Sequence, residues 1–98
     1  MAKFALLVEM KVKPGKEGEI EPFLAKEASM VRGEAGTLSW HAGRIEGETG
    51  IYRVFDTFDT EAARDAHLNG PAGQEFVEKA GELFTEAKIS RLTIVAQK

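Results

Sequence analysis

Residues 58–84 read FDTEAARDAHLNGPAGQEFVEKAGELF, and this stretch combines the end of a strand with two helices. Gly70 can end the first helix, which we expect at about residues 60–69. Pro71 can open the second helix, expected at about 72–84, because proline is favoured at the first position of a helix. A pair of helices therefore lies late in the chain, between strands.

His67 is the only histidine expected on a helix, and it lies just before the break at Gly70. A ring held at that point is placed more firmly than one on a loop, and it can titrate or form hydrogen bonds near neutral pH. His67 is thus the first candidate for a functional residue.

The segment before these helices begins with a strand and a helix. Apolar and polar residues alternate over residues 3–12, which predicts a strand with one buried face. Residues 17–34 place apolar side chains three and four positions apart, as in an amphipathic helix. The charged residues of that helix, Glu27 among them, are expected on its solvent-facing surface.

Two more strands, expected at residues 37–46 and 51–58, flank the glycine-bounded loop 47–50 and should be antiparallel neighbours. A last strand is expected at about 88–96. The order strand, helix, strand, strand, helix pair, strand is that of a ferredoxin-like α+β domain, a split βαβ arrangement with a four-stranded antiparallel sheet. We expect residues 1–98 to form one such domain.

The predicted strands carry apolar residues on both faces of the sheet, among them Leu7 and Phe55. The helices can cover only one face. An uncovered apolar face is an association surface, so we expect a homodimer in which two sheets pack face to face.

Composition excludes several kinds of function. The net charge is −3, from 13 basic and 16 acidic residues, and the basic residues are spread along the chain, so no nucleic-acid or anionic-membrane surface is indicated. The absence of cysteine excludes disulfides and thiolate chemistry. The apolar run at residues 4–8 is too short for a signal sequence or a membrane span, and we expect a cytoplasmic protein.

Four segments, in this order, resemble the antibiotic biosynthesis monooxygenase (ABM) family: VKPGK at 12–16, EAGTL at 34–38, FDTEAA at 58–63 and AHL at 66–68. The likeness covers nearly the whole chain. It implies a dimeric α+β barrel with a pocket in each protomer between the sheet and its helices. Characterised members include oxygenases that use no metal, flavin or haem and oxidise phenols, quinols or anthrone-like polycyclics with dioxygen. Other members isomerise small metabolites or have no known activity.

Such an oxygenase needs a base and an apolar, aromatic-lined cavity, because the substrate itself supplies the electrons. His67 is the candidate base, or a hydrogen-bond partner for a substrate oxygen; alternatively its ring only ties the helix end to a neighbouring carbonyl. Trp40 could form a wall for a flat substrate, or be buried in the core or a dimer interface. His41 points to the opposite face of the sheet from Trp40.

Tyr52, Phe58, Asn69 and Phe84 are further candidates for contact with the substrate. Asn69 could orient a carbonyl, although asparagine before Gly-Pro also suits the end of a helix. Phe58 and Phe84 also suit the core. No metal site is expected, because the two histidines lie far apart and neither belongs to a ligand motif.

Two other functions remain open at this point. One is an isomerase or lyase that uses the same pocket and base for proton transfer without oxygen. The other is a non-catalytic dimeric module that binds a small ligand.

Overall fold

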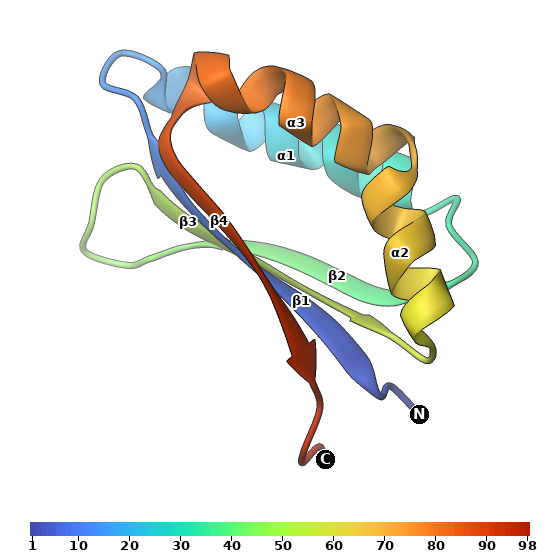
Figure 1. The fold of residues 1–98 in the computed structure, drawn as a ribbon. Coiled ribbons are helices and arrows are strands. Elements are labelled where there is room, and N and C mark those ends of the chain that lie inside the picture. Colours follow the sequence, from blue (N-terminus) through green and yellow to red (C-terminus); the bar gives the residue numbers. More distant parts are fainter.

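The computed structural model describes residues 1–98, and it has four strands and three helices. Their bounds are β1 (Phe4–Val12), α1 (Glu17–Val31), β2 (Thr37–Arg44), β3 (Ile51–Phe58), α2 (Glu61–Asn69), α3 (Pro71–Leu83) and β4 (Phe84–Thr93). The strands form one antiparallel sheet in the order β2-β3-β1-β4. All three helices lie on one side of it (Figure 1). The predicted ferredoxin-like α+β fold is confirmed.

The last strand differs from the prediction. It begins at Phe84, directly after α3, and not near residue 88, because it pairs with β1 from Val12 opposite Phe84 to Phe4 opposite Thr93. Most of its side chains are exposed, so the first residues of this edge strand lack the apolar alternation that marks β1. Phe84 has extended backbone angles and was wrongly assigned to the helix.

The main core lies between the helices and the sheet. Ile20, Phe23 and Leu24 of α1 pack against Met10 of β1 and Val54 of β3. Full burial of each such side chain contributes about 1.5–3 kcal/mol to folding. The helix pattern read from the sequence is therefore the pattern that holds α1 on the sheet.

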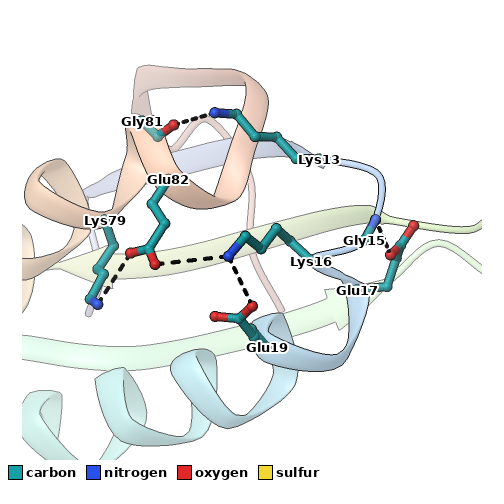
Figure 2. Close-up of polar contacts among 8 residues, drawn as sticks. All are labelled: Lys13, Gly15, Lys16, Glu17, Glu19, Lys79, Gly81 and Glu82. Atoms are coloured by element: carbon teal, nitrogen blue, oxygen red, sulfur yellow. Dashed lines mark hydrogen bonds and ion pairs between the residues drawn. The ribbon is translucent and has the colours of Figure 1, made fainter.

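The turn between β1 and α1 is tied to the end of α3 by exposed polar contacts (Figure 2). The Lys13 side chain donates a hydrogen bond to the carbonyl of Gly81, and its main-chain N–H donates to the carbonyl of Leu83 at 2.8 Å. Lys16 Nζ lies 3.2 Å from a Glu19 oxygen and 4.0 Å from a Glu82 oxygen. Exposed ion pairs of this kind contribute roughly 0–1 kcal/mol each, so they position the turn more than they stabilise the fold.

The other face of the sheet carries no helix (Figure 1). His41 of β2 pairs with Phe55 of β3 on this bare face, whereas Trp40 and Asp56 pair on the helix-covered face. Trp40 and His41 therefore lie on opposite faces, as the strand period predicted. Phe55 is 41% exposed.

None of the helices combines the length and the apolar composition that crossing a lipid bilayer requires.

Helices α2 and α3 approach closely at Gly73, and this gives a test of the packing. A Cβ atom at Gly73 would lie 2.1 Å from the main-chain oxygen of Leu68, whereas one at Gly81, also in α3, would meet nothing within 4 Å. We expect Gly73→Ala to lower the free energy of unfolding by about 1–3 kcal/mol through overpacking. Gly81→Ala should instead raise it by about 0.5–1 kcal/mol, because alanine favours the helix. Urea unfolding measures both, and equal midpoints would contradict the close approach.

Candidate functional site

His67 lies in the last turn of α2, and the ends of that helix hold it in place. Thr60 caps α2: its Oγ1 accepts a hydrogen bond from the N–H of Ala63 at 3.0 Å. Gly70 ends the helix, and its N–H donates to the carbonyl of His67 at 3.2 Å. The His67 ring is buried and packs on Phe58, with 5.5 Å between the ring centroids.

Both nitrogens of His67 contact carboxylates. Nδ1 lies 2.6 Å from Oε1 of Glu34, in the turn after α1, and Nε2 lies 2.9 Å from Oδ2 of Asp56, on β3. An imidazole can donate to two carboxylates at once only when it is protonated. Burial disfavours that charge, but the hydrogen bonds and charges of Asp56 and Glu34 outweigh burial and raise the pKa of His67. The two contacts thus favour a charged His67 ring, held between two acids.

Asp56 is the most deeply buried of these groups, with 1% of its surface exposed. Its Oδ1 has no hydrogen-bond partner. Burial raises the pKa of Asp56, and the hydrogen bond and charge of His67 oppose that rise. The buried surroundings of Asp56 thus favour its protonated form.

Glu27 of α1 is a third buried acid. It is 5% exposed, and its Oε2 has no hydrogen-bond partner. Burial, followed by the negative charge of Glu75 on α3, raises the pKa of Glu27 from 4.5 to about 7. Glu27 is therefore partly protonated near neutral pH. We expected it on the surface of α1, and that prediction is wrong.

A small apolar cavity of about 60 Å³ lies next to these groups, between the helices and the sheet. Its walls are mostly hydrophobic, and its only ionisable lining residues are Glu27 and His67. Trp40 and Phe76 contribute aromatic walls. The cavity is smaller than one of about 150 Å³ that holds benzene in an engineered protein, so an aromatic ligand requires side chains to move.

The most exposed large hydrophobic side chains of the cavity wall are at its edge. Val77 of α3 is 69% exposed and Ile89 of β4 is 43% exposed, and both line the cavity. We call these two residues the rim. Exposed side chains change rotamer within nanoseconds, so the rim is where the cavity can widen.

A larger open groove, about 370 Å³, lies between α1 and β2. Trp40 and Leu24 line both this groove and the cavity. Tyr52 also lines the groove, and its hydroxyl donates to Oε2 of Glu21 at 2.6 Å. The same oxygen accepts from Nε of Arg44 at 3.2 Å. Trp40 is thus shared by the cavity and the groove.

The candidates chosen from the sequence are only partly brought together. His67 and Trp40 line the cavity, whereas Tyr52 lines the groove. Phe58 is fully buried against the His67 ring, and Phe84 packs in the core. Asn69 is exposed, and the polar contact it makes is through its main-chain carbonyl, which accepts from Gln74 Nε2 at 3.0 Å.

Sequence reasoning missed the three acids Glu27, Glu34 and Asp56. The signal for Asp56 was present, because it follows Tyr52 and Val54 by steps of two and so lies on the buried face of β3. Glu27 likewise lies three residues after Leu24, on the buried side of α1. An acid at a core-facing position was the sign to look for.

Comparison with known proteins relates the chain to a family. The family model for Antibiotic biosynthesis monooxygenase (ABM) matches residues 3–79. Uncharacterized protein sll1783 of Synechocystis is 30% identical over 91 residues, which cover 90% of this chain and 60% of that protein. This chain therefore spans about 60% of the length of that curated relative.

Two solved structures share the whole fold. Protein NE2512 of Nitrosomonas europaea, of unknown function, has a TM-score of 0.92 at 34% identity, and the match covers 100% of this chain and 94% of that one. Protein Rv0793 of Mycobacterium tuberculosis has a TM-score of 0.87 at 18% identity, over 98% of each chain. At that identity the second likeness shows the fold alone.

The buried Glu27 carboxyl predicts a specific pH dependence of stability. A folded pKa of about 7 against 4.5 means that the folded state holds this proton longer than the unfolded chain. Its contribution to stability is complete below pH 4.5 and is lost as the pH rises to about 7. Glu27→Gln, which cannot ionise, should match the wild type at pH 4.5 and exceed its free energy of unfolding by up to about 3 kcal/mol at pH 8.

Urea unfolding at several pH values measures this difference. Glu19→Gln, at an exposed position in the same helix, is the matched control and should show a much smaller pH-dependent change. A stability difference for Glu27→Gln that does not vary with pH would contradict the raised pKa.

Proposed function

Because the chain belongs to the antibiotic biosynthesis monooxygenase family, we propose that it oxygenates a small aromatic, quinol or polyketide-like substrate with dioxygen. The observation that supports this proposal is the apolar cavity with two ionisable groups in its wall, Glu27 and His67. Once widened at its rim, a cavity of this kind can bind an aromatic alcohol, remove its proton and keep the resulting anion away from water.

The proposed reaction takes all its electrons from the substrate. A quinol that loses a proton becomes an electron-rich anion, and dioxygen adds to a ring carbon as a peroxide. Protonation of the peroxide and loss of water leave a hydroxylated quinone, so that one oxygen atom enters the product and the other leaves as water. The balance requires no other reductant, and we propose that the protein works without a metal, flavin or haem.

His67 and Trp40 have separate roles in this proposal. Trp40 offers a flat apolar wall to the ring of the substrate. His67, held between Asp56 and Glu34, balances the charge of the buried acids around the cavity. Phe58 supports the His67 ring from the side of the sheet.

We also propose that the protein is a homodimer joined through the bare faces of two sheets. Leu7, Ile51 and Phe55 present apolar side chains on that face, next to an ion pair in which Arg53 lies 3.4 Å from Glu9. An apolar strip on the surface of a small domain is normally covered by another surface. A second copy of the chain offers a matching one.

Oxygen uptake tests the proposed reaction. We expect the purified protein to consume dioxygen with a member of a panel of quinols, naphthols and anthrones, and to do so in the presence of a metal chelator. His67→Gln, which keeps a hydrogen-bond donor beside the carboxylates, should lower the rate at least tenfold, because it removes the positive charge. His41→Ala, at the other histidine, is the control; because His41 lies on the face proposed for the dimer, the mass of this variant is compared with that of the wild type.

The outcomes separate the candidate functions. No uptake with any member of the panel would contradict the oxygenase and favour either an isomerase or lyase or a non-catalytic ligand-binding module, neither of which uses oxygen. Uptake that His67→Gln leaves unchanged would retain the enzyme and remove His67 from its mechanism. Circular dichroism confirms that each variant is folded.

The dimer has its own test. Phe55→Glu places a charge in the middle of the bare face and should convert the dimer to a monomer at micromolar concentration. Val95→Glu, at a residue that is 93% exposed beyond β4, is the control and should leave the dimer intact. Sedimentation equilibrium measures the mass, and a wild-type monomer would contradict the proposal.

A further inference from the structure

We infer that Glu27 is the residue that takes the proton from the substrate, and that the substrate is a single-ring phenol or quinol. This inference rests on the proposed function and assigns the base of the same site. Three observations carry it: the hydrogen bonds already made by His67, the free oxygen of Glu27, and the size and walls of the cavity.

His67 has no nitrogen left to act as a base. Nδ1 lies 2.6 Å from Glu34 and Nε2 lies 2.9 Å from Asp56, so each ring nitrogen already has an acidic partner. A substrate could use His67 only by displacing one of these carboxylates. His67 is therefore a positioning residue, which holds the acids in place and sets the charge beside the cavity.

Glu27 has the acceptor that His67 lacks. Its Oε2 is buried and has no hydrogen-bond partner, and the residue lines the cavity. A buried polar atom without a partner costs about 1–3 kcal/mol, which a ligand that donates a hydrogen bond would recover. A phenolic O–H is such a donor.

The surroundings of Glu27 also suit a base. A carboxylate with an ordinary pKa is a poor match for a phenol, whose own pKa is near 10. Burial and then the charge of Glu75 on α3 bring the pKa of Glu27 to about 7, while His67 of α2 and Lys26 of α1 lower it and Glu34 raises it. The difference in pKa between Glu27 and the phenol is thereby roughly halved. The ionised form of Glu27 is still present at neutral pH.

The proton then has a complete path. The O–H bond of the quinol breaks, and its proton passes to Oε2 of Glu27, which leaves the quinol anion and a neutral carboxylic acid. Once dioxygen has added to the ring as a peroxide, Glu27 returns the proton to the peroxide oxygen. Loss of water then gives the hydroxylated quinone, with Glu27 ionised again.

The size of the cavity points to one ring. Its volume of about 60 Å³ has to grow even for a benzene-sized ligand, and movement of Val77 and Ile89 at the rim can provide that growth. Trp40 and Phe76 offer faces for a single ring to stack on. A fused polycyclic would have to displace the core around Leu24.

Binding of 4-fluorophenol, a single-ring phenol that resists oxidation, tests the inference apart from turnover. An ionised Glu27 accepts a hydrogen bond from the phenol more strongly than a neutral Glu27 does. The affinity of the wild type should therefore rise about tenfold as the pH passes from 5.5 to 8.5. Glu27→Gln should bind at least tenfold more weakly at pH 8.5 and show no such rise. Isothermal titration calorimetry measures both proteins.

A second variant tests the base without removing it. Glu75→Gln removes a negative charge that raises the pKa of Glu27, so the midpoint of the pH dependence should move to lower pH while the affinity at pH 8.5 stays the same. If Glu27 had only a structural role, Glu75→Gln would not move this midpoint. The midpoint should move to lower pH by the same amount when the titration is followed through the carboxyl carbon resonance of Glu27 by nuclear magnetic resonance.

The outcomes are distinct. Binding that has the same pH dependence in Glu27→Gln as in the wild type, or oxygen uptake that survives this change, would overturn the inference. Absence of phenol binding to the wild type would overturn it as well. Binding with the expected pH dependence but without oxygen uptake on the quinol panel would support Glu27 as the proton acceptor and reject the oxygenase reaction.

Discussion

The hydrogen-bonded contact of His67 with Asp56 and Glu34 is the interaction on which the arrangement of helices and sheet depends. It joins α2 to β3, an inner strand of the sheet, and to the turn that follows α1, so it connects three separate segments. Burial of charged groups is costly, so the contact persists only because each partner compensates the other. Loss of one partner from a buried pair costs about 3–5 kcal/mol, mostly through the charge that is left behind. The contact therefore specifies where α2 sits more than it stabilises the domain.

The surplus of acids beside this contact lowers the stability of the folded state, and this is one reason to propose a functional site here. A stable core would have an apolar residue at the position of Glu27, where the carboxyl instead lies next to hydrophobic walls with one oxygen unpaired. Residues of this kind collect at functional sites, where their pKa values are shifted by burial and neighbouring charge. The site thus combines an electrostatic disadvantage in the folded state with a group ready to exchange a proton.

The sequence was sufficient for most of the fold and for little of the site. Alternation over Phe4 to Val12 predicted β1 because that strand is buried on one face, and β4 was placed too late because an edge strand with exposed side chains has no such pattern. His67 was found from its position before Gly70. The strand period could have placed Asp56 on the buried face of β3. That Asp56 and Glu34 both contact His67 depends on how separate elements pack, and no local pattern encodes that packing.

The small volume of the cavity has a consequence for affinity. A molecule whose rim is closed cannot bind an aromatic ring, so only the fraction with an open rim takes up a ligand. If about one molecule in a hundred is open, the measured affinity is about a hundredfold weaker than that of the open form. Val77 and Ile89 are exposed, and exposed side chains change rotamer within nanoseconds, so opening through their movement lowers the affinity without becoming the slow step. In the proposed site, two surface side chains that touch no reacting atom thus reduce the affinity for the ligand.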